Sequence, residues 1–245
     1  PGQSSLNPRS ILFQPNSAAM TSNPTCIALF DLDNTLIPID SDVAWARFLI
    51  DLGVVDPDWY SRRNDHFYAQ YTAGTLDIFE FLAFQLAPLA AHPLETLLSW
   101  REAFMTTCIT PHIGEPARAL VQGHLDAGDL VAIVTATNTF ITTPIAEAFQ
   151  VPHLIGTELE TDPQGRFTGR PLGVPSFQEG KVVRLAQWLA TRGTELEAFE
   201  TSYFYSDSRN DLPLLGRVTH PVAVNADPTL AAHAKAEGWP MILLP

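Results

Sequence analysis

The chain has 245 residues, of which 46% are hydrophobic and 17% are charged. This composition is typical of a globular protein and excludes a disordered tail protein or a fibrous repeat. The formal net charge of −13 disfavours a nucleic-acid partner, because binding to phosphate backbones requires a positively charged surface.

The N-terminal segment, the lengths of the apolar stretches and the two cysteines indicate the cellular compartment in which we expect the protein. Residues 1–23 are rich in Ser, Pro and Asn, and their one apolar run, residues 11–13, is too short for a signal peptide, so we expect a disordered tail. Every other apolar stretch is interrupted well before about 18 residues, which predicts a soluble protein with no membrane partner. Cys26 and Cys108 lie far apart in apolar stretches, so we expect buried free thiols in a reducing, cytoplasmic compartment.

The first part of the chain combines one strand with a helical insert. Residues 26–30 form an apolar run followed by the acidic, turn-like sequence DLDNT, which predicts a buried strand with carboxylates at its end. The pattern then changes to helix in segments that begin at or near Ser, Thr, Asp or Pro. We therefore expect an all-helical cap domain over residues 40–109, with helices at 41–53, 56–74, 75–89 and 92–108.

Short apolar runs alternate with helical patterns over the rest of the chain, and a hairpin is expected around the turn at 162–165. This alternation predicts a parallel sheet with helices on both faces. We expect an α/β, doubly wound, Rossmann-like core built from residues 24–39 and 110–245. Its helices are expected at 114–127, 139–149, 179–192, 209–216 and 227–237, and its further strands at 129–135, 153–157, 202–206 and 221–224.

Pairs of carboxylates follow two of the predicted strands. Asp31 and Asp33 point to the same side of an extended chain, so they repel each other unless a cation or a shared proton intervenes. Asp207 and Asp211 are four residues apart and share one face of a first helical turn. The alternative interpretation of each pair is a polar turn or a helix cap.

Two other stretches indicate an anion site. Thr135 and Ala136 lie between a predicted strand and a helix, where hydroxyl and backbone N–H groups bind phosphate. Lys181 lies in a first helical turn, where the helix dipole favours a bound anion, and the chain has only one other lysine, Lys235. An ordinary cap and a solvated lysine are the alternatives. Because ligands bind beyond the carboxyl ends of parallel strands, we expect these features and the carboxylates to share one crevice.

In this order the segments resemble the motifs of the haloacid dehalogenase superfamily of aspartate-nucleophile phosphatases, in its phosphoserine-phosphatase-like branch with a helical cap. The first motif, Asp-x-Asp-x-Thr, stands as residues 31–35, the second as Thr135 and the third as Lys181. The fourth, Gly-Asp-Ser-x-x-Asp, stands as residues 206–211, with Ser206 in place of Gly, which replaces no reacting group. The resemblance runs from about residue 25 to residue 243.

The resemblance implies a Mg²⁺-dependent phosphomonoester hydrolase that acts on a small phosphorylated metabolite. Asp31 would attack phosphorus to form an aspartyl-phosphate, and Asp33 would act first as an acid and then as a base. Mg²⁺ would bind Asp31, the Asp33 backbone carbonyl and Asp207, with Asp211 as a supporting residue. The residues implied to bind the phosphate are Thr135, Ala136 and Lys181.

Other functions remain as alternatives on the same fold. A phosphotransferase would use the same chemistry, and a non-catalytic module would only bind a phosphate ligand, although the four principal motif residues are all present. A zinc hydrolase or a cysteine phosphatase is disfavoured, because no two histidines have the close helical spacing of a zinc pair and neither cysteine follows a predicted strand beside a base.

Asp40 and Asp42 are candidates for substrate specificity, because Asp40 falls near the position where phosphoserine phosphatases carry a glutamate that holds the substrate amino group. A carboxylate and aromatic faces would accept an amine-bearing ester such as phosphoserine or histidinol phosphate. The alternative is that the two aspartates cap a helix, the aromatics form the core of the insert, and Arg62 and Arg63 are solvated. The aromatic residues concerned are Trp45, Phe48, Trp59, Tyr60, Phe67, Tyr68 and Tyr71.

Overall fold

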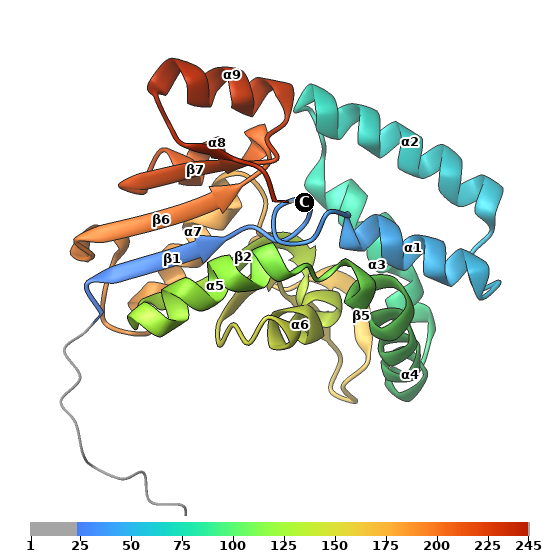
Figure 1. Ribbon diagram of the computed structural model, residues 1–245. Coiled ribbons are helices and arrows are strands. Elements are labelled where there is room, and N and C mark those ends of the chain that lie inside the picture. The colour runs from blue at the N-terminus through green and yellow to red at the C-terminus, as the bar shows by residue number, and fades with distance from the viewer. Residues whose placement is uncertain (1–23, 245) are drawn as a thin grey trace, which may run out of the picture.

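The computed structural model describes residues 24–244 and shows a six-stranded parallel sheet with helices on both faces (Figure 1). The predicted tail, residues 1–23, lies outside the described residues. In the strand order β3-β2-β1-β6-β7-β8, the chain adds β2 and β3 on one side of β1 and β6, β7 and β8 on the other. This reversal of the strand order at β1 confirms the doubly wound fold. The strands are β1 (Cys26–Phe30), β2 (Leu130–Asn138), β3 (Leu154–Thr157), β6 (Thr201–Ser206), β7 (His220–Val224) and β8 (Met241–Ile242).

Alternate side chains of the strands fill two apolar clusters, one on each face of the sheet. In β1, Ala28 and Phe30 belong to one cluster, and Ile27 and Leu29 belong to the other. Because both faces are buried, the strands are almost entirely apolar and polar side chains are left to the strand ends. The first face is covered by α5 (Glu115–Ala127) and α6 (Thr139–Ala148), and the second by α7 (Glu179–Ala190), α8 (Leu212–Leu215) and α9 (Pro228–Glu237).

Between β1 and β2, the first four α-helices form the insert and lie beyond the carboxyl ends of these strands, as the sequence predicted (Figure 1). Asp40, Asp56 and Asp77 accept backbone N–H hydrogen bonds from the first turns of the first three helices, which explains where these helices begin. Within residues 24–244, no helix is long and apolar enough to cross a bilayer. The four helices are α1 (Ser41–Asp51), α2 (Pro57–Ala73), α3 (Ile78–Ala91) and α4 (Leu94–Phe104).

The end of the insert is less regular than expected. The helix predicted for residues 92–108 begins only at Leu94, because Pro93 has an extended backbone conformation. It continues as a π-helical turn at Met105–Ile109 and a 3-10 turn at Thr110–His112. These turns lead the chain back to the sheet.

The predicted hairpin is formed by two antiparallel strands, β4 (Leu159–Thr161) and β5 (Phe167–Pro171). The Asp162 carboxylate accepts the backbone N–H groups of Gln164 and Arg166 and so stabilises the turn. The hairpin packs against α3, where a Cβ atom on Gly169 would lie 3.3 Å from Ala90 Cβ. The hairpin therefore connects the core to the insert through its contact with α3.

Several sequence expectations were wrong in detail. The helix expected at 209–216 is a 3-10 turn, Arg209–Asp211, followed by the short α8, because the Ser208 side chain accepts the Asn210 N–H and tightens the chain. The two cysteines are free, as expected, but both are half-buried rather than buried. The edge strand β8 was not predicted.

Candidate active site

The segments that were expected to share a crevice meet at the carboxyl ends of β1, β2 and β6. Asp31 directly follows β1, Asp207 directly follows β6, and Thr135 lies in the last part of β2. The backbone N–H of Asp31 donates to the carbonyl of Tyr205 at 2.9 Å, which aligns the ends of β1 and β6. Lys181 reaches the same place from the first turn of α7.

Lys181 is the buried cation of the site. Its Nζ lies 2.7 Å from Asp31 Oδ1 and 2.7 Å from Asp211 Oδ2. Burial by itself lowers the pKa of Lys181, but the adjacent carboxylates of Asp211 and Asp31 raise the pKa above its ordinary value, so the ammonium stays charged. The neighbouring Gly180 permits this placement, because a Cβ atom there would lie 1.9 Å from the Pro175 carbonyl oxygen.

Asp31 and Asp207 approach each other through a shared hydroxyl. Thr35 Oγ1 lies 3.2 Å from Asp31 Oδ2 and 3.2 Å from Asp207 Oδ1, and it accepts the backbone N–H of Asp207 at 3.0 Å. Burial, and next the negative charge of Asp31, raise the pKa of Asp207 to about 9. The ionised form of Asp207 is therefore unfavourable beside Asp31 and Asp211, in spite of the nearby lysine, unless a proton or another cation offsets its charge. The first motif contained Thr35, but its role in joining two strand ends was not predicted.

Asp33 occupies a second, separate hydrogen-bond network. Its Oδ1 accepts the Ser41 backbone N–H at 2.7 Å, and its Oδ2 accepts the Thr137 hydroxyl at 2.9 Å. Burial, followed by the charge of Asp40, raises the pKa of Asp33 to about 6. Thr137 belongs to the stretch in which hydroxyls were expected to bind an anion, but its contact with Asp33 was not predicted.

The structure corrects the local setting of Thr135 and Ala136. These residues were expected at a helix start, but β2 continues to Asn138 and α6 begins at Thr139, because the Asn138 side chain caps that helix. The pairing of β2 with β3 is irregular between Val134 and Asn138. Thr135 is fully buried with its hydroxyl 3.4 Å from Asp33 Oδ2, and Ala136 is a half-buried strand residue.

Hydroxyl groups near Asp211 form a further layer that was not predicted. Ser206, which stands where the resembled motif has glycine, donates to Asp211 Oδ2 at 2.7 Å. The Tyr71 hydroxyl of α2 lies 3.0 Å from Ser208 Oγ, which connects the helical insert to the loop after β6. The Gln178 side chain donates to Asn210 Oδ1 at 3.0 Å, so this loop is also tied to the start of α7.

Asp40 and Asp42 lie on the insert side of the site but have different environments. Asp40 is exposed and caps α1 by accepting the Val43 N–H at 2.9 Å, as the capping alternative proposed. Asp42 instead accepts the Thr137 hydroxyl at 3.1 Å, so it does not act as the cap of α1. Burial, followed by the charges of Asp40 and Asp33, raises the pKa of Asp42 well above its ordinary value.

The aromatic residues of the insert divide into two groups. Trp45, Tyr60 and Phe67 are buried and form apolar core, which agrees with the alternative interpretation. Arg62 is exposed, but Arg63 lies over the Phe67 ring at 4.8 Å and also pairs with Glu80, so it is not simply solvated. Among the other aromatic residues singled out in the sequence, Phe48 is half-buried, and Trp59, Tyr68 and Tyr71 are exposed.

Solved structures with this fold include a protein of unknown function from Bordetella pertussis Tohama I. It is 51% identical, has a TM-score of 0.85, and the match covers 90% of this chain and 99% of that one. A substrate-bound phosphoserine phosphatase complex is 19% identical with a TM-score of 0.62, over 89% of this chain and 91% of that one, and shows the fold alone.

Relatives with assigned activities are similar over most of their length. A histidinol-phosphatase of Neisseria meningitidis serogroup C is 50% identical over 216 residues, which are 88% of this chain and 97% of the relative. A phosphoserine phosphatase of Mycobacterium tuberculosis is 30% identical over 223 residues, which are 88% of this chain and 70% of the relative. Residues 28–216 match the haloacid dehalogenase-like hydrolases. The chain belongs to the haloacid dehalogenase-like hydrolase family.

Proposed function

We propose that this chain, a phosphatase of its family, hydrolyses a small amine-bearing phosphate monoester through an aspartyl-phosphate on Asp31. The observation that carries the proposal is the position of Asp31, whose carboxylate lies against the Lys181 ammonium at 2.7 Å and beside the Thr35 hydroxyl. A carboxylate held in this way is oriented for attack on phosphorus, and a cation beside it offsets the charge of an incoming phosphate.

The residues fit a bound Mg²⁺. Asp31 and Asp207 would hold the ion with their carboxylates, which the Thr35 hydroxyl brings together, and the backbone carbonyl of Asp33 would be the further ligand that the family resemblance implies. Hard oxygen ligands are those that Mg²⁺ prefers. Within residues 24–244, no lysine, arginine or histidine forms an ion pair with Asp207, and its pKa is raised to about 9 by burial and by neighbouring acids. A cation would relieve this repulsion. When bound, Mg²⁺ supplies neutralisation of the phosphate charge and orientation of the phosphoryl group.

The chain's own residues account for both half-reactions. An Asp31 oxygen forms a bond to phosphorus while the bond from phosphorus to the ester oxygen breaks, and Asp33 donates its proton to the departing alkoxide. The pKa of Asp33, raised to about 6 by burial, favours this acidic role. Asp33 then removes a proton from water, whose oxygen bonds to phosphorus as the bond to Asp31 breaks and phosphate is released. Lys181 and the Thr135 hydroxyl hold the phosphoryl oxygens.

The amine preference rests on Asp40 and Asp42, which place two carboxylates on the insert side of Asp33. An ammonium group of the leaving alcohol would pair with the exposed Asp40 carboxylate, whereas a neutral sugar would gain nothing from it. The similarity to a histidinol-phosphatase supports this substrate class. Histidinol phosphate is therefore the first ester to test, with phosphoserine second.

The mechanism is tested by Asp31→Asn, which is nearly isosteric but has no nucleophilic carboxylate. We expect no measurable steady-state turnover from the pure variant, and we expect rapidly quenched wild-type enzyme to carry a hydroxylamine-sensitive phosphate label that the variant lacks. Asp51→Asn, at the exposed end of α1, is the matched control and should remain active. Turnover by Asp31→Asn would refute the covalent route.

The specificity is tested by kcat/KM over a panel of amino-alcohol phosphates, sugar phosphates and nucleotides, with wild type and Asp40→Asn. The variant should lose activity on amine-bearing esters and keep its activity on neutral ones. If neutral sugar phosphates are the best wild-type substrates, or if Asp40→Asn lowers all substrates equally, the amine preference is wrong and the phosphatase chemistry is unaffected.

A further inference from the structure

A cluster of metal-ligating side chains lies at the end of the sheet opposite to the phosphatase site. Cys26 is the first residue of β1, His124 lies in the last turn of α5, and Asp129 directly precedes β2. One donor atom from each of the three lies within 4.8 Å of the other two. Asp31 follows the other end of β1, so the length of this strand separates the two sites.

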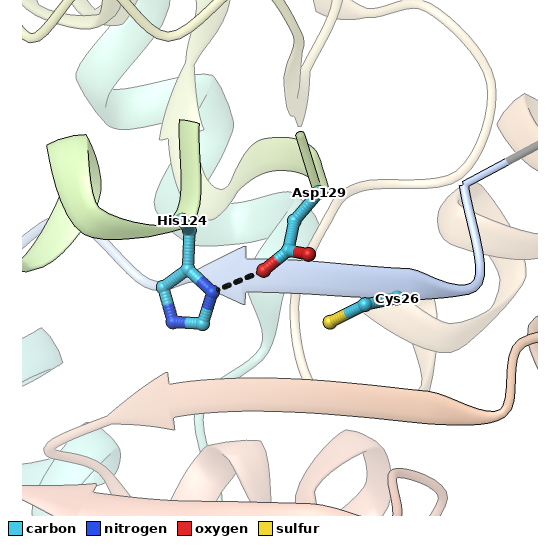
Figure 2. A group of neighbouring side chains, drawn as sticks. All are labelled: Cys26, His124 and Asp129. Carbon is cyan, nitrogen blue, oxygen red and sulfur yellow. Dashed lines mark hydrogen bonds and ion pairs between the residues drawn. The ribbon is translucent and has the colours of Figure 1, made fainter. Parts of the chain in front are cut away.

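The strand alternation explains why these residues meet. Cys26 shares its side of β1 with Ala28 and Phe30, which face α5. In Figure 2 the sulfur of Cys26 points toward the pair formed by His124 and Asp129. The three side chains are half-buried, so the cluster is open to solvent on one side, where a water could complete a coordination shell.

The imidazole of His124 is held from both sides. Its Nε2 lies 2.9 Å from the Tyr205 hydroxyl and its Nδ1 lies 2.7 Å from Asp129 Oδ2. The Tyr205 ring is itself stacked on Phe30 at 4.7 Å. Because a carboxylate can only accept, Nδ1 carries the hydrogen that is donated to Asp129 in the metal-free protein. Loss of this hydrogen on metal binding would leave Nε2–H as the donor to Tyr205 and turn the Nδ1 lone pair toward the carboxylate and the thiol. A histidine ligand whose other nitrogen is hydrogen-bonded in this way is the usual arrangement in metal sites.

We propose that Cys26, His124 and Asp129 bind a zinc-class divalent cation. Sulfur, imidazole nitrogen and carboxylate oxygen together match Zn²⁺ and Co²⁺ and do not suit Mg²⁺, which prefers oxygen alone. The thiolate and the carboxylate balance the charge of a divalent ion, and within residues 24–244 no lysine or arginine pairs with Asp129. On binding, the cation takes the place of the thiol proton and of the proton between His124 Nδ1 and Asp129, and both protons are released to solvent.

A simpler explanation covers only part of this arrangement. Gly128 ends α5 in a left-handed conformation, and the Asp129 backbone N–H donates to the His124 carbonyl at 3.1 Å, so the His124–Asp129 pair could serve only to fasten α5 to β2. That explanation assigns no role to the sulfur beside the pair. A test must therefore detect whether the sulfur coordinates the metal.

Cobalt provides such a test, because a Co²⁺–thiolate bond produces a near-ultraviolet charge-transfer band that an all-oxygen site does not. The full chain is titrated with Co²⁺ in excess Mg²⁺, which occupies the phosphatase site. We expect the band to saturate at one equivalent, to disappear in Cys26→Ser and to weaken in His124→Gln. Cys108→Ser is the matched control, because Cys108 is also free and half-buried but lies on the π-helical turn, with Thr107 Oγ1 at 3.4 Å.

A second measurement uses the unmodified protein and does not depend on the folding of a variant. The rate of maleimide labelling of Cys26, followed by peptide mass spectrometry, should fall at least tenfold with one equivalent of Zn²⁺, while that of Cys108 stays constant. Phosphatase activity in Mg²⁺ should be the same in Cys26→Ser and wild type. A missing cobalt band in folded wild type, a band that survives in Cys26→Ser, or unprotected labelling of Cys26 would overturn the proposal.

Discussion

Replacing Lys181 with methionine should destabilise the chain more than any other single loss of charge in the site. The substitution keeps most of the buried aliphatic stem but removes the ammonium that lies 2.7 Å from both Asp31 and Asp211. Two buried carboxylates are then left without a cation. Breaking a buried ion pair costs about 3–5 kcal/mol, which corresponds to a fall in melting temperature of roughly 6–20 °C for a protein of this size.

The control is Lys235→Met, because Lys235 is the only other lysine of the chain and is exposed on α9. An exposed substitution of this kind should change stability by no more than about 0.5 kcal/mol. Both variants are unfolded in urea with EDTA present, so that no added cation compensates for the lost ammonium. If Lys181→Met loses less than about 1 kcal/mol, the assignment of Lys181 as the charge that holds the two carboxylates together is wrong.

Three further outcomes are expected. Gly180→Ala should destabilise the chain by about 1–3 kcal/mol, since the added Cβ would lie 1.9 Å from the Pro175 carbonyl oxygen. The control Gly123→Ala, in α5 with nothing within 4 Å of its Cβ, should stabilise the chain by up to about 1 kcal/mol. Equal effects of the two substitutions in thermal melts would contradict the close packing at α7. Tyr71→Phe should lower kcat/KM about fivefold, because one hydrogen bond to Ser208 is lost. The control Tyr68→Phe, on the exposed face of α2, should leave kcat/KM unchanged. An equal drop in both variants would indicate a general effect on the helix. EDTA should abolish turnover, and added Mg²⁺ should restore it. Ca²⁺ should not restore turnover, because this larger ion has a larger and less regular coordination shell. Full activity after exhaustive chelation would rule out a required metal.

The element order and the principal site residues could be predicted from sequence because each depends on local patterns. Apolar runs and capping residues mark most helices and strands, and the motifs that contain Asp31, Lys181 and Asp207 keep their spacing along the chain. The roles of Thr137 and Ser206 could not be predicted in this way. Thr137 meets Asp33 across 104 residues of sequence, so the contact depends on the register between β1 and β2.

The cluster of Cys26, His124 and Asp129 escaped prediction for the same reason. Cys26 belongs to β1, whereas His124 and Asp129 flank the end of α5, and no spacing rule connects these segments. Only the side of β1 on which Cys26 lies, together with the position of α5 on the sheet, brings the sulfur to the imidazole. Sequence reasoning considered histidine pairs and strand ends, and this cluster is neither.

The division of the helical insert between two apolar clusters determines which part of it can move. Side chains of α1, α3 and α4, such as Trp45, Leu86 and Phe104, belong to the same continuous cluster as the strands, so these helices should unfold together with the sheet. Helix α2 instead contributes Tyr60 and Phe67 to a small separate cluster. Amide hydrogens of α2 should therefore exchange with solvent well before those of the rest of the insert, and we expect this helix, rather than the whole insert, to be the part that is displaced when a substrate enters.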